Sequence, residues 1–174
     1  MGEQKYRVRN ARDVEFEDIA QLMVQVYSEL DGFPKASEQP GYYHMLANIG
    51  ALTHNPETEL LVAVSAENKI MGAVVYVGDM KYYGSGGSAP QEEKAAGFRL
   101  LAVDPMTRGQ GIGKTLALEC IRKARQNNQT QLIIHSTKHM QIAWAMYIHL
   151  GFERSEDLDF MQDELPVFGF RLLL

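Results

Sequence analysis

The segment Val103–Thr115 is the part of this sequence that most limits what the chain can fold into. It reads VDPMTRGQGIGKT, in which three glycines alternate with other residues between an apolar run and an amphipathic run. The Asp-Pro pair ends a strand, and the apolar period after Gly111 is helical, so we predict a strand, a tight turn and a helix. Glycines let the backbone approach a ligand, and a helix N-terminus favours negative charge. With Arg108 and Lys114 beside it, this turn is a candidate anion site.

Three known anion-binding patterns can be tested against the turn. A Walker loop requires glycine where Arg108 stands, although the final Gly-Lys-Thr fits. A dinucleotide fingerprint that starts at Gly109 requires glycine where Lys114 stands. The pattern Arg/Gln-x-x-Gly-x-Gly/Ala is complete, as Arg108, Gly111 and Gly113. A glycine-rich turn without a ligand remains the alternative.

A second motif follows one predicted strand later. The segment Ala143–Phe152 reads AWAMYIHLGF, with an alanine four residues before Tyr147 and a Leu-Gly-Phe end. Together the two motifs resemble the GNAT superfamily of N-acyltransferases, which binds the pyrophosphate of acetyl-CoA with the first motif. The resemblance covers about residues 98–159, and the runs at 98–105 and 156–159 resemble a bacterial subgroup of small-molecule and peptide acetyltransferases.

The resemblance implies the GNAT fold, a twisted mixed α/β sheet of six to seven strands flanked by about four helices. We expect residues 1–174 to form one such domain. Hydrophobic periodicity independently predicts strands at 6–8, 60–64, 70–77, 98–103, 132–135, 152 and 167–173, and helices at 13–30, 42–49, 111–126 and 140–150. The glycine-rich segment 82–90 is predicted to be a mobile loop.

Composition excludes several other classes of protein. The fractions of apolar residues, 45%, and charged residues, 22%, are typical of a soluble globular domain. One cysteine, Cys120, allows no internal disulfide and no zinc cluster. No apolar run is long enough for a membrane span or signal peptide, so we expect a cytoplasmic protein without a membrane partner. The net charge of −5 argues against a nucleic-acid partner.

The resemblance also implies positions for the donor, acetyl-CoA. Backbone groups of the strand before the turn would pair with the pantetheine arm, and one N–H would polarise the thioester carbonyl. The turn would hold the pyrophosphate, mainly through main-chain N–H groups. The expected coenzyme-binding residues are Leu101, Ala102, Val103, Arg108, Gly109, Gln110, Gly111, Ile112, Gly113, Lys114, Thr115, Met140 and Ala143.

Tyr147 is the catalytic residue that the resemblance implies, as the acid that protonates the departing thiolate. A thiol leaves readily because its ordinary pKa is about 8.5, so this acid would help without being indispensable. The alternative is a core tyrosine on an apolar helix stripe. The acetyl group would pass directly to an amine in a ternary complex, without a metal or a covalent enzyme intermediate.

Two departures from the family pattern affect the predicted site. Met140 stands where many members have asparagine, so a polar contact to the pantetheine arm is missing or is replaced by His139 or Ser136. Gly97 stands where many members have a glutamate that acts as general base. The remaining candidates for the base are bulk water, Glu92, Glu93, His44 and Asp163. The missing base keeps a catalytically silent CoA-binding module open as an alternative, while a nucleotide hydrolase fits poorly.

The acceptor is predicted from charge alone. The segment before the last strand carries six acidic residues against Arg154, namely Glu153, Glu156, Asp157, Asp159, Asp163 and Glu164. A rim of this kind would attract a cationic amine, either a small molecule or a peptide. A solvated acidic loop is the alternative. Trp144 and Ile148 on the last helix suggest a second cover, such as a homodimer partner.

Overall fold

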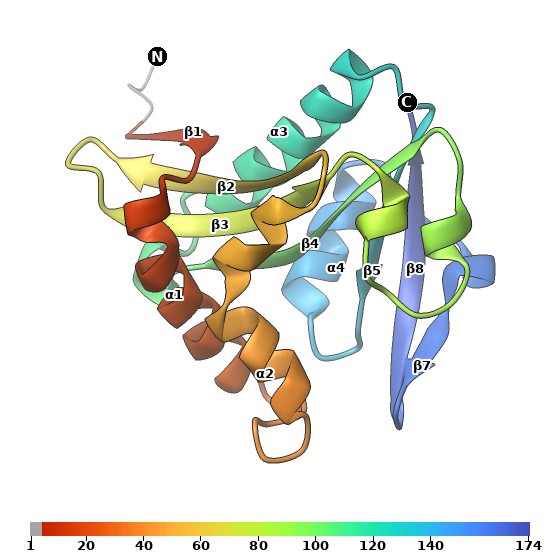
Figure 1. The fold of residues 1–174 in the computed structure, drawn as a ribbon, viewed down its shortest axis with the longest axis horizontal. Helices are drawn as coiled ribbons and strands as arrows, with labels where there is room; N and C mark the ends of the chain where they lie inside the picture. The colour runs from red at the N-terminus through yellow and green to blue at the C-terminus, as the bar shows by residue number, and fades with distance from the viewer. Residues whose placement is uncertain (1–4) are drawn as a thin grey trace.

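The computed structural model describes residues 5–174. They form an α/β domain, in which a mixed parallel and antiparallel sheet has two helices on each face (Figure 1). The sheet follows the order β1-β2-β3-β4-β5-β8-β6, and β7 pairs with β8. Its strands are β1 Tyr6–Asn10, β2 Thr58–Ser65, β3 Ile70–Val77, β4 Ala95–Val103, β5 Gln131–Ser136, β6 Glu153–Arg154, β7 Phe160–Gln162 and β8 Leu165–Leu173. Its helices are α1 Phe16–Ser28, α2 Pro40–Ala47, α3 Ile112–Gln126 and α4 Gln141–His149.

The helices divide the apolar core into two layers. Strand β2 is buried on both faces, because Leu60 and Val62 pack with α1 and α2 while Leu61 and Ala63 pack with α3 and α4. This two-sided burial explains why its sequence is a continuous apolar run rather than an alternating one. Cys120 lies on the buried face of α3 and is fully buried. No helix within residues 5–174 has the length and apolar character needed to cross a bilayer.

The sheet has eight strands rather than the six to seven expected. The difference lies after α4, where β6 has two residues and β7 has three. Such short strands have too few residues to show an alternating pattern, so the sequence predicted only a single strand position there.

Strands β4 and β5 form the one parallel pair among the described strands, and they stay paired for only three residue pairs. The last of these pairs is Gly97 with Ile133. Strand β4 nevertheless continues along β3 as far as Val103. The second half of β4 therefore has a strand on one side only, and backbone groups on its other edge have no ladder partner.

A β-bulge lies in β4 just beyond this point. Ala73 pairs with Ala102 and Val75 with Arg99, so Leu100 and Leu101 together oppose the single residue Val74. Leu100 has a φ of 59°, a left-handed conformation that costs a residue with a side chain about 1–3 kcal/mol. The buried Leu100 side chain packs with the α1 and α2 layer, which offsets this strain.

The glycine-rich segment 82–90 is not the mobile loop that its composition predicted. Tyr83 and Ala89 are buried in the core, and the carbonyl of Tyr83 accepts a hydrogen bond from Arg99 at 2.8 Å. Gly84 and Gly87 have φ values of 77° and 70°. The glycines are therefore required by the turns of a packed segment, and composition alone does not separate that use from mobility.

The side of helix α4 on which the sequence suggested a dimer partner is partly covered by β8 of the same chain. The Trp144 ring lies 4.9 Å from the ring of Phe170 and 5.4 Å from that of Phe168 in β8, measured between centroids. Ile148, one turn further along the same side of the helix, is 47% exposed. A homodimer is thus still only a prediction, and Trp144 does not require one.

The N-terminal strand is attached to α1 by an ion pair. The first residues of the predicted helix 13–30 instead form a 3₁₀ turn, Asp13–Glu15, and α1 starts at Phe16. The Glu15 carboxylate accepts from Arg9 of β1 at 2.8 Å and 3.0 Å. The hydrogen bonds from Arg9, opposed by partial burial, lower the pKa of Glu15 to about 2.

Because of this ion pair, we predict that part of the unfolding free energy is lost in acid. A carboxylate whose pKa is lower in the folded protein than in the unfolded chain stabilises the fold above its unfolded pKa. That stabilisation is lost as the pH falls from about 4.5 towards about 2. We therefore expect Glu15→Gln to flatten the pH dependence of the unfolding free energy in this window, measured by urea titration. Glu17→Gln, at an exposed position in the same helix, is the control; an equal effect of both changes would contradict the assignment.

Candidate functional site

The glycine-rich turn connects β4 to α3 and exposes unpaired backbone N–H groups. Gly109 and Gly111 have φ values of 84° and 80°, and Gly111 is the N-cap of α3. The first helical hydrogen bond runs from the Thr115 N–H to the Gly111 carbonyl at 3.0 Å. The N–H groups of Ile112, Gly113 and Lys114 precede this bond and have no acceptor in the helix. The turn therefore offers several donors at the positive end of a helix dipole.

A strand far away in the sequence fixes the shape of this turn. The Tyr6 hydroxyl of β1 lies 2.8 Å from the Thr115 hydroxyl and 3.3 Å from the Gln110 carbonyl oxygen. The predicted residues Arg108 and Lys114 are exposed, and neither forms an ion pair with another residue in 5–174. Their charges are thus available to an anion. Tyr6 was not predicted as part of the site, because nothing in its local pattern marks a contact so far along the chain.

The turn lies against both β4 and α4. A Cβ atom added to Gly113 would lie 3.5 Å from Val103 and 3.7 Å from the sulfur of Met146. The glycine-rich turn, the end of β4 and helix α4 are therefore neighbours in space. This adjacency places the two sequence motifs in one site beside the unpaired edge of β4.

The Leu-Gly-Phe end of the second motif is a Schellman cap. The Phe152 N–H donates to the Tyr147 carbonyl and the Gly151 N–H to the Ile148 carbonyl, both at 3.0 Å, with Gly151 at a φ of 102°. The cap turns the buried Phe152 ring back onto the helix, where it lies 5.9 Å from the Tyr147 ring and 6.1 Å from that of Phe98 in β4. The motif thereby fixes the position of Tyr147.

Tyr147, the predicted proton donor, is buried in the α3 and α4 layer. It is 5% exposed, and its hydroxyl has no hydrogen-bond partner within residues 5–174. Burial is the main cause that raises the pKa of this hydroxyl above its ordinary value, and nearby Tyr83 adds to it. The hydroxyl therefore keeps its proton at neutral pH and can donate it to a group that enters the site.

A buried hydroxyl without a partner lies at the end of β5. Ser136 is 2% exposed, and its Oγ is one of two buried side-chain polar atoms in 5–174 that lack a hydrogen bond, together with Nε of Arg9. A buried hydroxyl normally finds a partner, since leaving it unpaired costs about 1–3 kcal/mol. Ser136 is therefore suited to bind an amide-containing chain such as a pantetheine arm.

The structure separates the two other residues that were predicted on α4. Met140, the N-cap residue, packs with the α1 and α2 layer, while Ala143 packs with the α3 and α4 layer. His139, the other suggested replacement, approaches Gly32, where an added Cβ would lie 2.8 Å from its Nδ1. Ala143 thus shares its layer with Tyr147, and Met140 does not.

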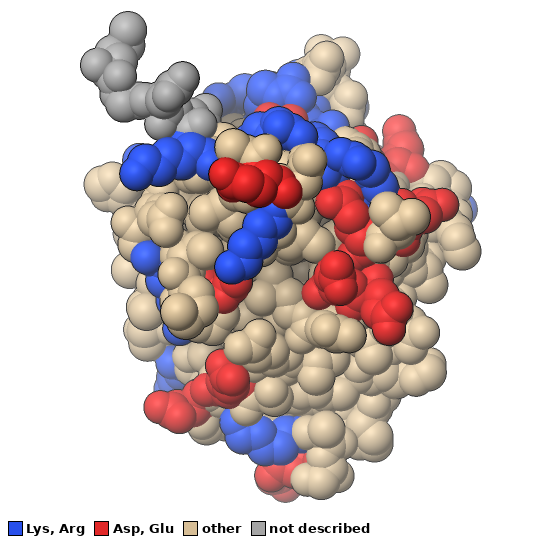
Figure 2. Space-filling view, turned by 90° about the vertical axis from the view of Figure 1, so that its left-hand side faces the viewer, with Lys and Arg blue, Asp and Glu red and all other residues tan. Residues whose placement is uncertain are grey.

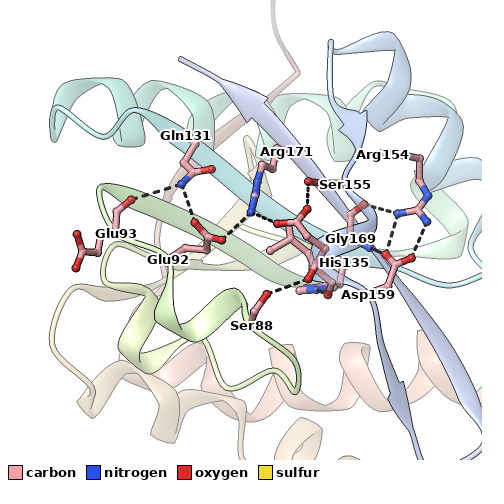
Figure 3. Close-up of polar contacts among 12 residues, drawn as sticks. Ser88, Glu92, Glu93, Gln131, His135, Arg154, Ser155, Asp159, Gly169 and Arg171 are labelled. Carbon is pink, nitrogen blue, oxygen red and sulfur yellow. Dashed lines mark hydrogen bonds and ion pairs between the residues drawn. The ribbon is translucent and has the colours of Figure 1, made fainter.

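The position of the missing general base is filled by an aromatic ring. A Cβ atom added to Gly97 would lie 2.7 Å from the Tyr83 ring and 2.9 Å from the Ile133 carbonyl oxygen. Of the candidate bases, Glu92 is held by Arg171 at 2.7 Å and by Gln131 at 3.3 Å (Figure 3). The other three candidates, Glu93, His44 and Asp163, are exposed. This arrangement leaves no space for a carboxylate at position 97.

Tyr83 instead forms a hydrogen-bonded pair with His135 of β5. Nε2 of His135 lies 2.9 Å from the Leu158 carbonyl oxygen, which can only accept, so Nε2 carries the proton. Nδ1 then accepts from the Tyr83 hydroxyl at 3.0 Å. Burial is the main cause that lowers the pKa of His135, so the ring is neutral at neutral pH. Sequence analysis gave His135 no role because its neighbours come from distant segments.

The acidic segment is partly neutralised by Arg154, which lies within it, and by Arg171 of β8. Asp159 accepts from Arg154 at 2.8 Å and 2.9 Å and from the Gly169 N–H at 2.7 Å (Figure 3). Asp157 lies 2.6 Å from Arg171. The other acidic residues of the segment, Glu153, Glu156, Asp163 and Glu164, are exposed. Figure 2 shows a different face, the left-hand side of Figure 1, where basic and acidic side chains lie close together beside a large uncharged area.

Comparison with known proteins places the chain among acetyltransferases. The model of the GNAT acetyltransferase family matches residues 21–152. A curated relative, the uncharacterized N-acetyltransferase YjgM of Escherichia coli strain K12, is 30% identical over 115 residues, which are 64% of this chain and 68% of the relative.

Solved structures share the fold at low sequence identity. A GNAT acetyltransferase from Staphylococcus aureus Mu50 has a TM-score of 0.74 at 16% identity and covers 97% of this chain and 99% of its own. The acetyltransferase yncA from Salmonella typhimurium, solved with acetyl-CoA, has a TM-score of 0.68 at 14% identity and covers 98% and 94%. The PaiA N-acetyltransferase of Thermoplasma acidophilum, solved with coenzyme A, has a TM-score of 0.70 at 12% identity and covers 94% and 97%.

The left-handed turn predicts a sensitive position for anion binding. In Gly111→Ala the Cβ atom opposes the φ of 80°, so the backbone should shift and redirect the N–H groups that follow. We expect the affinity for acetyl-CoA to fall by about tenfold or more, measured by calorimetry. The control is Gly87→Ala, which introduces similar strain at a φ of 70° in a different loop and should leave the affinity unchanged. Equal affinities for wild type and Gly111→Ala would contradict the assignment of the turn.

Proposed function

Because this chain belongs to the GNAT acetyltransferase family and is an acetyl-CoA-dependent acyltransferase, we propose that its acceptor is a primary amine that attacks acetyl-CoA directly in a ternary complex. The observation that carries the proposal is the separation of β4 and β5 after Gly97, with the anion-binding turn at the end of β4. The edge of β4 can pair with an extended amide-containing arm while the turn holds phosphate groups.

We assign the donor site to the residues that lie together beside this edge. The N–H groups of Ile112, Gly113 and Lys114 would bind the pyrophosphate, with Arg108 supplying further positive charge. Ala143 and the unpartnered Ser136 hydroxyl would contact the pantetheine arm. These assignments rest on adjacency, exposed N–H groups and burial.

The backbone of β4 would also polarise the thioester. The Leu101 carbonyl already accepts a hydrogen bond from the Tyr27 hydroxyl of α1 at 3.2 Å, which holds the bulge in place. We therefore propose that the acetyl carbonyl uses a backbone N–H of the segment 101–103. A rigid donor of this kind stabilises the negative charge that develops on the carbonyl oxygen as the amine attacks.

The reaction depends mainly on holding the amine and the acetyl carbonyl in the right position. A free alkylamine has a pKa of about 10.4, so it must lose a proton before its nitrogen can attack the acetyl carbonyl. Holding the two reactants together can lower the barrier by about 7–11 kcal/mol. The C–N bond forms, the C–S bond breaks, and the Tyr147 hydroxyl would donate a proton to the thiolate. With the space beside Gly97 filled by Tyr83, we assign the removal of the amine proton to water.

The exposed acids of the segment 153–164 favour an amine that approaches as a cation. Since Asp157 and Asp159 are engaged by arginines, any attraction would come mainly from the four exposed carboxylates that form no ion pair within residues 5–174. Surface charges of this kind raise the rate of encounter more than the affinity, and salt screens them.

Thiol release tests the proposal directly. We expect acetyl-CoA with a panel of primary amines to release free thiol, and the products to carry an amide-linked acetyl group by mass spectrometry. We also expect acetyl-CoA at about 100 times its Kd to add about 2.7 kcal/mol of stability, while ATP adds none. Thiol release that is unaffected by every amine, or a shift with ATP alone, would exclude the proposed function.

The role of Tyr147 is tested by removing one oxygen atom. Tyr147→Phe should lower kcat by about 10²-fold with little change in the KM for acetyl-CoA, because the ring packing with Phe98 and Phe152 is kept. The loss should shrink as the pH rises past about 8.5, where a thiolate leaves without help. The control is Tyr76→Phe, which removes a buried hydroxyl that accepts from Asn127 instead. An unchanged kcat across this pH range would assign Tyr147 to the core alone.

A further inference from the structure

Arg99 is a half-buried arginine in the wedge between β4 and β5. It follows the last residue pairs of these strands, since Gly97 pairs with Ile133 and no pair follows. Arg99 pairs with Val75, whose side chain lies in the α1 and α2 layer, and paired residues share a face of the sheet. Arg99 therefore points to the side opposite Tyr147, which packs with α3 and α4.

Arg99 differs from the other half-buried arginines in the described chain. Arg9, Arg154 and Arg171 each form an ion pair with a carboxylate, at 2.8 Å, 2.8 Å and 2.6 Å respectively. Arg99 forms no ion pair within residues 5–174, and its one hydrogen bond goes to the Tyr83 carbonyl at 2.8 Å. A guanidinium has several further N–H donors, and a charge that is withdrawn from water is normally paired. The guanidinium of Arg99 can therefore bind an anion that comes from outside the described chain.

The surroundings of Arg99 are aromatic rather than acidic. Burial is the main cause that raises the pKa values of Tyr42 and Tyr83, and the charge of Arg99 opposes it in both, so the guanidinium lies near both phenols. Tyr42 packs 5.9 Å from the Tyr27 ring and 5.8 Å from that of Phe33. The backbone of Gly84 lies against the guanidinium, where an added Cβ would be 2.7 Å from Nη1. The charge is thus held in place by aromatic walls and a packed loop.

We propose that Arg99 binds a carboxylate on the acceptor, so that the acceptor is an amino acid or another primary amine that carries a carboxylate. This inference rests on the proposed function, because it places the acceptor on the α1 and α2 side of the β4–β5 opening. A planar guanidinium binds a carboxylate through two parallel hydrogen bonds and so also fixes its orientation. The amine of the same molecule is then held near the unpaired edge of β4. A zwitterion also fits the exposed acids of the segment 153–164, which would attract its ammonium group.

Matched acceptors test the carboxylate requirement. Amino acids with apolar, aromatic and basic side chains are compared with their α-amides and their decarboxylated amines, with kcat/KM read from thiol release. We expect the best acceptor to carry a free carboxylate and its amide to be worse by about 10²-fold, the scale of a lost charge-assisted hydrogen bond. Amides or decarboxylated amines that react as well as the acids would overturn the inference and leave amine acetylation standing.

Variants then locate the requirement at Arg99. Arg99→Gln should lower kcat/KM for the amino acid by about 10²-fold and that for its amide by less than about threefold. Arg171→Gln, a change at a half-buried arginine that is already paired, should keep the preference for the acid. An equal loss for acid and amide in Arg99→Gln would show a structural role through Tyr83 and overturn the inference. If Arg99→Gln does not fold, Arg99→Lys, which keeps the charge without the planar fork, should reduce the preference to about tenfold.

A binding measurement tests the carboxylate site without relying on acetylation. With coenzyme A bound, calorimetry compares amino acids and their amides on wild type and Arg99→Gln. Binding of the acids to wild type that is lost in Arg99→Gln supports the carboxylate site even if no amine in the panel is acetylated. Equal binding to both proteins, or none to either, overturns it. Failure of the proposed function is distinguishable, since there acetyl-CoA itself neither binds nor releases thiol with any amine.

Discussion

The rest of this structure depends on the early end of the parallel pairing between β4 and β5. After three residue pairs the strands separate, and the bulge at Leu100 and Leu101 changes the course of β4 just beyond that point. A strand edge without a neighbour is costly inside a protein unless something else satisfies its backbone groups. Here Tyr27 satisfies the Leu101 carbonyl, and the remaining groups of this edge are available to an extended ligand.

The separation creates two compartments because each face of the sheet has its own layer of helices. On one side Tyr147 is fixed by the Schellman cap of α4 and by the rings of Phe98 and Phe152. On the other side Arg99 lies among aromatic side chains from α1, α2 and the segment 82–90. The two sides suit different tasks, since one presents a protonated phenol and the other a positive charge. Donor and acceptor could thus approach one opening from opposite faces.

Gly97, which stands where many family members have glutamate, is closely surrounded by other residues. A carboxylate there would collide with the Tyr83 ring, which packs onto the glycine and donates its hydroxyl proton to His135. A glycine in the middle of a strand weakens the strand, because it contributes no side chain to packing. The Tyr83 ring supplies that packing from another segment. The Tyr83 ring therefore fills the space beside Gly97. The position carries no charge, whereas a glutamate there would carry a negative one.

The sequence by itself determined the local features of this protein. The strand, turn and helix around Gly111 and the cap at Gly151 follow from backbone preferences that act over a few residues, so their patterns identified the family and predicted where its donor would bind. Only the tertiary structure decided which charged side chains lack an ion pair and are available to a ligand. Asp157 and Asp159 are engaged by Arg171 and Arg154, whereas Arg99 has no carboxylate within the described chain. The physical reason is that an ion pair depends on the distance between side chains in the folded chain: Arg171 reaches Asp157 from another strand, and even the nearby Arg154 and Asp159 meet only through the turn between them.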